Sequence, residues 1–313
     1  MSAAVAPAPT GETVTVCIAT YRRLPRLALL LQDLQAQQRV PDEVVIIDND
    51  AAASAQPVVE AARARGLPFS LVYRVQPEKN ISITRNWTFD HASSDWLACI
   101  DDDERAPPEW IAGLLSAARR YDASIVLAPV IPVVPDDAPD WIRAGDFYSF
   151  PRMASGGEVP PNRLRFGNLL LRAAAVRATS VRFDPALGLT GGEDCDLLIR
   201  LRNQGLRIVW CDEAIVREPV EASRLQLGWL FKRALRGGQD FARSTWQGQY
   251  APIGIGGRLH FLADTTVKLL ASALLMVLEF PLGRHRAAKR LFQLAANSGK
   301  LSALCGAHYR EYR

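Results

Sequence analysis

Apolar and polar positions alternate with two different periods along the first 130 residues, which predicts alternating strands and helices. Short apolar runs predict strands at Val14–Ala19, Glu43–Ile47, Leu71–Val75, Trp96–Ile100 and Ser124–Val130. Amphipathic stretches between them predict helices at Arg26–Gln37, Ser54–Arg65, Ile81–His91 and Pro108–Arg119. This alternation is typical of a Rossmann-like α/β fold, with a mostly parallel sheet covered by helices on both faces.

The pattern becomes irregular between Ile131 and Arg165, where prolines and glycines are frequent. A loop of this length in a compact domain is usually functional or disordered. Its aromatic residues, Trp141 among them, need packing partners and therefore favour order. We interpret the loop as a lid or an acceptor-binding segment. Regular elements are then predicted again, a strand at Phe166–Leu171, a helix at Asp194–Asn203 and a strand at Arg207–Trp210.

The chain beyond Glu218 has a helical and basic pattern. Leu225–Arg236 places apolar residues on one helical face and basic residues on the other. Leu269–Phe280 is an apolar stretch of 12 residues with a basic cluster directly after it. Because crossing a bilayer takes about 20 residues, this stretch is too short to span one. Two interpretations stay open, a buried helix and an interfacial helix anchored by the basic cluster.

Charge is distributed unevenly along a composition that is otherwise that of an ordinary globular protein, 49% hydrophobic and 22% charged. Residues 219–313 contain 14 Lys and Arg against 5 Asp and Glu, whereas the whole chain has a net charge of only +4. A basic tail on an acidic body predicts attraction to an anionic surface. No basic motif interleaved with aromatic residues is present, so we expect a membrane as partner and no nucleic acid.

Cysteine usage and the first residues indicate the compartment. The five cysteines are scattered without paired spacing, which favours a reducing environment and argues against a structural zinc site. Residues 1–12 are rich in Ala and Pro, and they lack both a basic start and an apolar core. They are predicted to form a flexible tail rather than a signal peptide. The protein is expected in the cytoplasm, peripheral at the inner face of the plasma membrane.

Candidate chemistry begins with the consecutive carboxylates Asp101, Asp102, Asp103 and Glu104, which follow a buried strand. Stacked carboxylates repel one another unless a cation neutralises them, and Mn²⁺ or Mg²⁺ with a substrate diphosphate is the natural choice. A solvated acidic turn with Asp103 as a helix cap is the alternative. Tyr21, Asp48 and Asp101 all follow predicted strands, where open α/β sheets bind ligands. Neither a dinucleotide-binding glycine motif nor a P-loop is present.

Five motifs in register carry a resemblance to a known family. They are Val14–Arg23, Val45–Asp50, Arg85-Asn86, Asp101–Asp103 and Gly192–Asp194. Together they resemble the family 2 glycosyltransferases, and the stretch from Phe183 to Gly238 resembles the succinoglycan-type branch that builds bacterial surface polysaccharides. The resemblance implies a GT-A fold that acts on nucleotide-diphosphate sugars. It implies a catalytic domain at 13–245, with a nucleotide-binding half at 13–130 and an acceptor half at 131–218. A basic helical extension follows at 246–313, and its association with the membrane is one of the two open interpretations given above.

The resemblance also implies roles for individual residues on the donor side. Nucleotide-sugar contacts would come from Thr20, Tyr21, Arg22, Asp48, Asn49, Arg85, Asp102, Arg233 and Arg236. Asp101 and Asp103 would hold the metal against the diphosphate. The family usually has a second acidic residue where this chain has Asn49. Because an amide both donates and accepts, the base identity stays open, with UDP preferred.

On the acceptor side the resemblance favours Asp194 as the base that deprotonates the acceptor hydroxyl, with Gly192, Glu193 and Trp141 nearby. A capping carboxylate without chemistry is the alternative for Asp194. One base and one displacement imply inversion at the anomeric carbon. Gly237 stands where processive relatives often have tryptophan, so a single sugar is expected to move to a glycan or lipid-linked glycan. No histidine lies between residues 92 and 259 to complete a metal shell.

Three rival functions would each require a different sequence pattern. A nucleotidyltransferase would need a glycine-rich loop after the first strand, and Ala19–Arg23 contains no glycine. A phosphatase of the haloacid dehalogenase type would need its paired aspartates on the first strand. A degenerate GT-A-fold, membrane-associated binding protein without turnover is the third, and the presence of both Asp103 and Asp194 argues against it.

Overall fold

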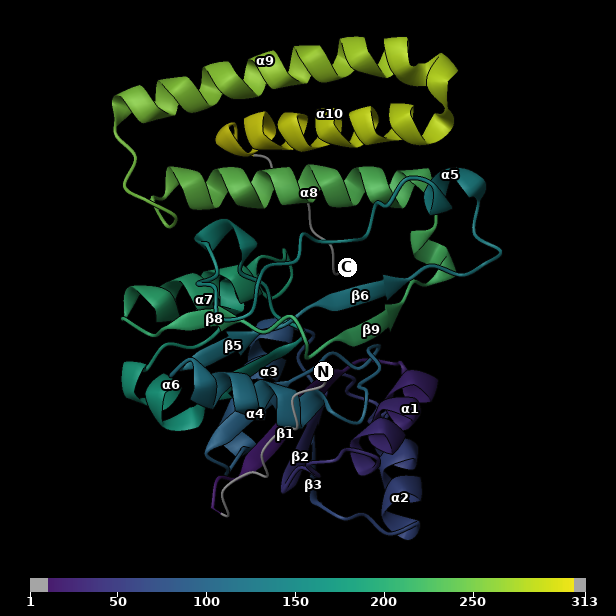
Figure 1. Ribbon diagram of the computed structural model, residues 1–313, viewed down its shortest axis with the longest axis vertical. Helices are drawn as coiled ribbons and strands as arrows, with labels where there is room; N and C mark the ends of the chain where they lie inside the picture. The colour runs from purple at the N-terminus through teal and green to yellow at the C-terminus, as the bar shows by residue number, and fades with distance from the viewer. Residues whose placement is uncertain (1–10, 307–313) are drawn as a thin grey trace, which may run out of the picture. The chain divides into compact units, whose positions relative to one another are not determined.

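The computed structural model describes residues 11–306, so most of the predicted tail lies outside the described residues (Figure 1). The chain divides into two compact units. We call the first the sheet unit; its described part comprises residues 11–131, Phe150–Leu189 and Glu193–Glu218. We call the second the helical unit; it comprises Pro132–Ser149, Thr190–Gly192 and the described residues from Pro219 onward.

The sheet unit contains a seven-stranded sheet of order β3-β2-β1-β4-β7-β5-β8. Its strands are β1 (Val14–Thr20), β2 (Glu43–Asp48), β3 (Ser70–Val75), β4 (Trp96–Cys99), β5 (Ile125–Leu127), β7 (Leu169–Arg172) and β8 (Ile208–Trp210). β7 is antiparallel to both of its neighbours, and the other pairs are parallel. The predicted mostly parallel α/β sheet is therefore confirmed.

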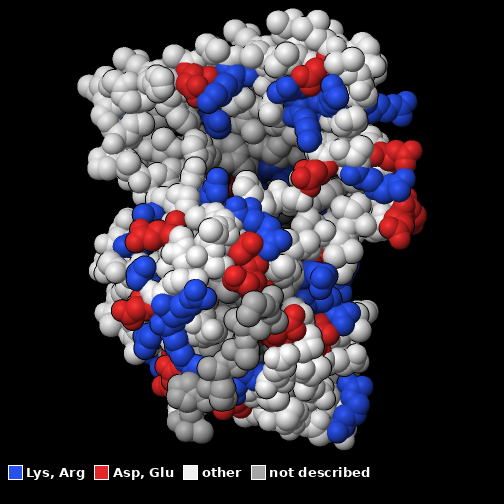
Figure 2. Space-filling view, viewed as in Figure 1, with Lys and Arg blue, Asp and Glu red and all other residues white. Residues whose placement is uncertain are grey.

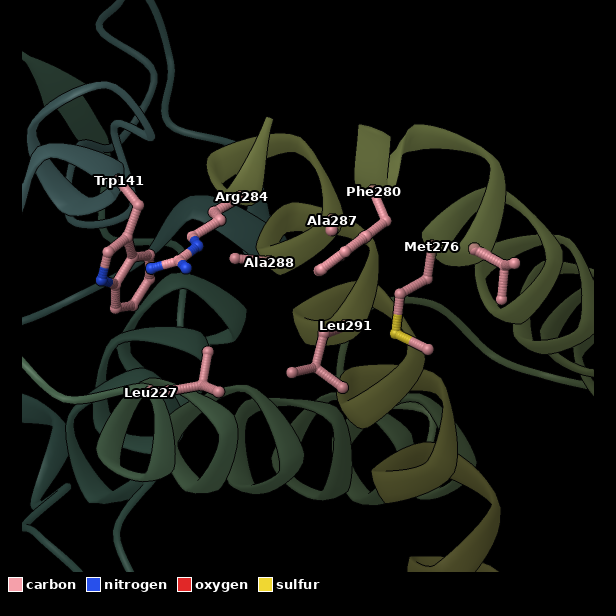
Figure 3. A pocket seen from close by; sticks show the side chains of 9 residues that line it. Trp141, Leu227, Met276, Phe280, Arg284, Ala287, Ala288 and Leu291 are labelled. Carbon is pink, nitrogen blue, oxygen red and sulfur yellow. The ribbon is translucent and has the colours of Figure 1, made fainter. Parts of the chain in front are cut away.

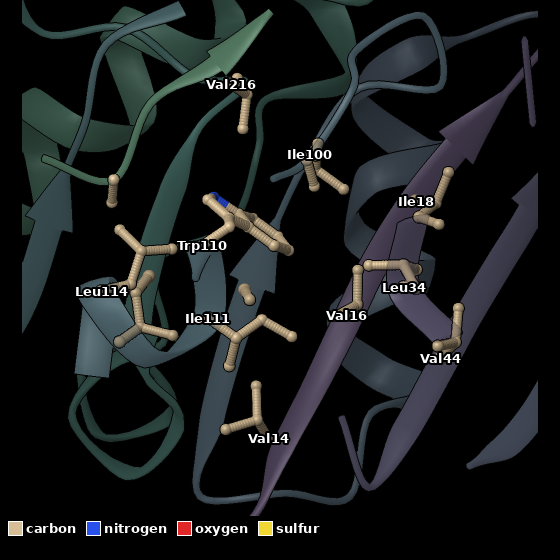
Figure 4. Packing of buried hydrophobic residues seen from close by; sticks show 14 of the residues in the cluster. Val14, Val16, Ile18, Leu34, Val44, Ile100, Trp110, Ile111, Leu114 and Val216 are labelled. Carbon is tan, nitrogen blue, oxygen red and sulfur yellow. The ribbon is translucent and has the colours of Figure 1, made fainter. Parts of the chain in front are cut away.

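The core of the sheet unit forms where alternate strand residues meet helices. The helices are α1 (Leu24–Gln35), α2 (Gln56–Ala64), α3 (Ile81–His91), α4 (Trp110–Arg120), α6 (Ala173–Thr179) and α7 (Glu193–Asn203). Val14, Val16 and Ile18 of β1 share one cluster with Leu34 of α1 and Trp110 of α4 (Figure 4). This packing follows from the period of two along a strand. It fixes the carboxyl ends of β1, β2 and β4 at one edge of the sheet.

The segment predicted as a long loop contains regular structure at both of its ends and in its middle. β6 (Val130–Val133) pairs with β9 (Val216–Pro219) in a separate two-stranded sheet, and Val220 N donates to Val133 O at 2.9 Å. Pro132 lacks an N–H group, which suits a short strand with a single partner. A short helix α5 (Asp140–Arg143) and a 3₁₀ turn at Pro161–Arg163 follow. The predicted boundary at Ile131 therefore falls inside a strand.

The helical unit is built on α8 (Leu227–Trp246), α9 (Ile255–Glu279) and α10 (Arg284–Leu304), with α10 between the other two (Figure 1). α9 corrects the prediction for Leu269–Phe280. With the turn after it, the helical stretch Ile255–Leu282 is long and apolar enough, by length and composition, to cross a membrane. Glycines and charged residues interrupt the apolar pattern in its first half, but a helix can continue through them.

The buried interpretation of the apolar helix is also wrong. Val267, Leu270 and Leu274 of α9 are 65%, 64% and 62% exposed. Thr265 and Ser272, seven residues apart and therefore on one helical face, are buried instead. α9 thus buries these two small polar side chains and leaves apolar side chains exposed.

Candidate active site

The carboxyl ends of β1 and β4 are joined by a side-chain hydrogen bond. The Thr20 hydroxyl donates to Asp102 Oδ2 at 2.7 Å. Asp102 is buried, and burial raises the pKa of its carboxyl while Arg23 opposes the rise. Thr20 and Asp102, both predicted to contact the nucleotide sugar, therefore lie in contact although they are distant in sequence.

Arg23, to which the sequence reasoning assigned no role, contacts the carboxylate cluster. Its Nη1 atom lies 2.9 Å from Asp102 Oδ1 and 2.9 Å from Asp103 Oδ2. It immediately precedes α1, so its position is fixed by the turn after β1. The predicted Arg22 instead pairs with Asp50 at 2.8 Å. Two consecutive arginines at a strand end were the available signal, but only the fold shows which one reaches the carboxylates.

Burial and mutual repulsion hold protons on the carboxyl cluster after β4. Burial raises the pKa of Asp103 to about 7, with further contributions from Asp101, Glu218 and Asp102 and opposition from Arg23. Burial likewise raises the pKa of Glu104, and the charges of Asp101 and Asp103 add to the rise. Glu104, whose role was not predicted, accepts a hydrogen bond from Asp101 N at 3.2 Å. A buried carboxyl group such as Asp103, whose pKa is raised to about 7, is one whose charged form a cation would stabilise.

The donor atoms at this cluster suit a hard divalent cation. Aspartate and glutamate oxygens are the ligands that Mg²⁺ and Mn²⁺ prefer. Among residues 11–306, no group of three or more His, Cys, Asp or Glu side chains is arranged to hold a metal ion. Mg²⁺ commonly uses one or two carboxylates together with substrate phosphates. The two carboxylates Asp101 and Asp103 are enough for a site of this kind.

The turn after β2 is held by the two side chains that were predicted to contact the base. Asp48 Oδ2 accepts from Ala55 N at 2.8 Å and from the Tyr73 hydroxyl at 2.9 Å. The Asn49 amide donates to Gln76 O at 3.0 Å, and its Oδ1 accepts from Asn80 N at 3.1 Å. Both side chains are buried. Their observed contacts shape the turn, and base contact stays a prediction.

Exposed groups lie beside this turn. Tyr21 is 38% exposed, and the Arg22 guanidinium lies over its ring with 5.1 Å to the centroid. Lys79 Nζ also lies over the Tyr21 ring, 5.4 Å from the centroid. Arg22 adopts a φ of 57°, a conformation that is uncommon outside glycine. The sequence reasoning did not single out Lys79, which carries no motif of its own.

Arg85 connects Asp101, a predicted metal ligand, to Glu193, a residue predicted on the acceptor side. It projects from α3, whose N-terminus is capped by Asn80 Oδ1 accepting from Ile83 N at 3.2 Å. Its guanidinium pairs with Glu193 at 2.9 Å and with Asp101 at 3.3 Å. Phe166 packs against the same guanidinium, 4.6 Å from the ring centroid.

Asp194 is the second residue of α7 and directly follows Glu193, which belongs to this ion pair. It is half-buried, and its Oδ1 accepts from Cys195 N at 2.8 Å. Its Oδ2 accepts from Phe166 N at 3.4 Å. Asp194 therefore lies one residue from the chain of contacts that runs from Glu193 through Arg85 to Asp101.

Four further predicted residues belong to the helical unit. Arg233 lies over the Trp229 ring, 5.5 Å from the centroid, and lines a polar pocket of about 320 Å³ together with Arg236. Gly192 has a φ of 87°, and Trp141 lines a separate apolar pocket. Their participation in one site with Asp103 stays a prediction.

Comparison with known proteins decides the family. The sequence model described as "Glycosyl transferase family 2" matches residues 15–178. The chain belongs to this family. The resemblance carried by the five motifs is confirmed, and the enzyme is a glycosyltransferase. The match covers β1 through α6, including Arg23 and the Asp101–Asp103 cluster.

Two curated relatives match over most of their length. The "Succinoglycan biosynthesis protein ExoM" of Rhizobium meliloti is 39% identical over 236 residues, which are 74% of this chain and 74% of the relative. The "Galactofuranosyltransferase GlfT1" of Mycobacterium tuberculosis is 30% identical over 225 residues, 66% of this chain and 70% of the relative.

Solved structures confirm the GT-A fold of this glycosyltransferase. The mannosyltransferase PcManGT from Pyrobaculum calidifontis, in complex with GDP-Man and Mn²⁺, has a TM-score of 0.67 at 18% identity and covers 96% of this chain and 89% of its own. S. aureus TarS in complex with UDP has a TM-score of 0.54 at 17% identity, covering 95% and 93%. At such identities the likeness supports the fold alone.

Proposed function

We propose that this glycosyltransferase moves a single sugar, with inversion, from a nucleotide-diphosphate sugar to a hydroxyl of a glycan or lipid-linked glycan in bacterial polysaccharide synthesis. The buried carboxylates Asp102 and Asp103, which meet at Arg23 after β4, carry the proposal, because a divalent cation with a substrate diphosphate would stabilise their charged forms further. The relative named for succinoglycan biosynthesis supports the pathway class. Neighbours in complex with UDP or GDP-Man support a nucleotide-sugar donor, and UDP is our preferred nucleotide.

On the donor side, Asp101 and Asp103 would hold Mn²⁺ or Mg²⁺. Bound there, the ion would supply positive charge to the diphosphate leaving group. Thr20, the last residue of β1, orients the Asp102 carboxylate through its hydrogen bond. The orientation of this carboxylate is therefore set by a protein group and not by solvent. Arg85 is positioned between Asp101 and Glu193 to stabilise further negative charge.

On the acceptor side, Asp194 would take the proton of the attacking hydroxyl. Its neighbour Glu193 is committed to the Arg85 ion pair, whereas Asp194 accepts from two backbone N–H groups. A carboxylate has about four lone-pair sites, so Asp194 keeps acceptor capacity for a substrate proton. One base acting on one displacement gives inversion of the anomeric configuration.

The helical unit is proposed to hold the enzyme at the cytoplasmic face of the membrane. Large uncharged areas cover this unit on the face seen in Figure 2, interrupted by groups of charged residues of both signs. The exposed apolar face of α9 and the basic residues at the start of α10 would meet the bilayer together. Because polar Thr265 and Ser272 turn inward, we propose that α9 lies along the surface.

The proposal is tested with a panel of nucleotide sugars, with and without Mn²⁺, on wild type, Asp103→Asn and Asp194→Asn. We expect one donor to bind only with metal, Asp103→Asn to lose that binding, and Asp194→Asn to keep it while turnover falls about a thousandfold. Asp196→Asn is the matched control, because this aspartate is on the same helix turn but pairs with Arg200 at 2.6 Å. If wild type binds no nucleotide sugar, the binding-protein alternative replaces the enzyme.

A further inference from the structure

The helical unit contains an apolar pocket of about 570 Å³, and Trp141 is the one lining residue to which the proposed transferase chemistry assigns a role. Figure 3 shows side chains from α5, α8, α9 and α10 around it. They include Trp141, Leu227, Met276, Phe280, Ala288 and Leu291. Arg284 is the charged residue in the lining, and its side chain extends toward Trp141 (Figure 3).

The size of the pocket suits a hydrocarbon chain. An apolar cavity of about 150 Å³ is large enough to hold one benzene ring, so this pocket has roughly four times that space. By that measure about twenty carbon atoms fit, which is close to one acyl chain. An apolar lining gives such a chain contacts without any polar group left unpaired.

The surroundings of the pocket suit the rest of a lipid. Val277 and Phe280 line it and are 66% and 65% exposed, so the lining continues into the exposed end of α9. The first residues of α10 are basic, and Arg284 lines a second, smaller pocket next to His285. An apolar interior with a cation at its edge matches an amphiphile with an anionic head.

We propose that this pocket binds one acyl chain of an anionic membrane phospholipid, with Arg284 at the lipid phosphate. The proposal rests on the membrane attachment proposed above. The occupant is a membrane phospholipid because the pocket is continuous with the helix face that would meet the bilayer. Seating one chain between α9 and α10 fixes the depth of the helical unit in the membrane, which electrostatic attraction alone does not do.

The test uses Trp141 as a reporter inside the pocket. Vesicles of phosphatidylglycerol with brominated acyl chains quench tryptophan fluorescence only at close range, and Trp141→Phe isolates the contribution of this residue. We expect the Trp141 component to be quenched in wild type. Ala288→Phe fills the pocket and should reduce that quenching at least threefold, while the fraction of protein that pellets with vesicles is unchanged. Ala271→Phe, at an exposed position of α9 outside the pocket, is the control and should be quenched like wild type.

A second variant separates the headgroup from the chain. Arg284→Gln should weaken quenching by brominated phosphatidylglycerol but not by brominated phosphatidylcholine. If the protein pellets with vesicles while Trp141 is not quenched, or if Ala288→Phe is quenched as strongly as wild type, the pocket proposal is overturned and the membrane attachment stands.

A soluble lipid probe distinguishes failure of the membrane attachment from failure of the pocket proposal. If wild type does not pellet with vesicles, monomeric brominated lysophosphatidylglycerol still tests the pocket; quenching of Trp141 supports it and absence of quenching overturns it. Farnesyl phosphate is added as a competitor. Displacement of the brominated lipid by farnesyl phosphate at equal or lower concentration would make an isoprenoid phosphate the occupant and overturn the assignment to phospholipid.

Discussion

At the scale of single residues, Arg23 supplies to Asp102 and Asp103 the positive charge that a metal ion would also supply. Its guanidinium contacts one oxygen each of Asp102 and Asp103, and its side chain is 34% exposed. A divalent cation at Asp103 would meet this positive charge. Arg23 would therefore compete with a metal ion at this site until a diphosphate offered the guanidinium another anionic partner.

We expect Arg23→Gln to bind Mn²⁺ more tightly than wild type in the absence of nucleotide. Removing one positive charge beside the carboxylates should lower the dissociation constant for Mn²⁺ about tenfold. This figure already allows for the screening of the partly exposed Arg23 side chain by solvent. Isothermal titration calorimetry of the nucleotide-free protein measures this dissociation constant. Arg22→Gln, which loses a charge one residue away but contacts Asp50, is the control and should change little. Unchanged or weaker Mn²⁺ binding by Arg23→Gln would refute the competition.

The raised pKa values predict how stability depends on pH without metal. The folded protein holds a proton on Asp103 up to about pH 7, whereas the ordinary pKa of this side chain is 3.8. The folded state thus binds more protons than the unfolded state between these values, so stability should fall as pH rises from about 5 to 7. Asp50, whose pKa is lowered to about 2 by its hydrogen bond from Arg22, does not titrate in that window.

Urea unfolding at a series of pH values measures how the free energy of unfolding changes with pH. The substitution Asp103→Asn should make this pH dependence weaker. Added Mn²⁺ should restore more stability at the upper end of the window, because metal and proton compete for the same carboxylates. A metal-free wild type that gains stability from pH 5 to 7 would contradict the assignment.

At the scale of elements, two glycines allow α8 and α10 to pack closely. A Cβ atom at Gly238 would lie 1.9 Å from Ala296 O, and one at Gly299 would lie 2.0 Å from Leu235 O. Both obstacles are backbone atoms, which cannot rotate away as a side chain could. The neighbouring Gly237 has nothing within 4 Å of its would-be Cβ. Two adjacent glycines in one helix therefore have different roles.

We expect Gly238→Ala to destabilise the helical unit by about 1–3 kcal/mol, the usual cost of overpacking. Gly237→Ala should instead stabilise it by up to about 1 kcal/mol, because alanine is the better helix former. Urea unfolding followed by circular dichroism distinguishes the two. Equal effects of the two substitutions would show that close packing at Gly238 is unimportant.

At the scale of the whole molecule, charge and apolar surface are concentrated in the same region of the sequence. Residues 219–313 have an excess of nine positive charges, and within them α9 exposes its apolar face. Electrostatic attraction to an anionic leaflet gains about 1 kcal/mol for each basic residue near the surface and is screened by salt. Burial of apolar side chains is not screened. Membrane binding should therefore have a salt-sensitive and a salt-resistant part.

We expect pelleting with phosphatidylglycerol vesicles to fall at about 0.5 M salt without being abolished. The double substitution Leu270→Glu and Leu274→Glu should remove the salt-resistant part, since both side chains are more than half exposed and their loss does not disturb a core. Leu29→Glu, at a leucine of the sheet unit that is 40% exposed, is the control. Complete loss of wild-type pelleting in salt would leave α9 without a role at the membrane.

The sequence by itself determined the elements of the sheet unit and the identity of its central carboxylates. Strands such as Val14–Ala19 are recognisable because their apolar runs are local and short, and the motif Asp101–Asp103 is contiguous. The antiparallel direction of β7 could not be derived in this way, because it depends on the pairing of β7 with β4 and β5, which are distant from it in sequence. The length of α9 was also missed, since its charged and glycine positions interrupt the hydropathy pattern that defines a helix from sequence.

Only the tertiary structure decided which side chains share a site. Arg23 and Asp103 are 80 residues apart in the printed sequence, and Arg85 reaches Glu193 across a still longer separation. The raised pKa values of Asp103 and Glu104 likewise follow from burial, which is a property of the packed molecule. Sequence patterns record local periodicity and composition, whereas contact, burial and electrostatic coupling arise only when distant segments are brought together.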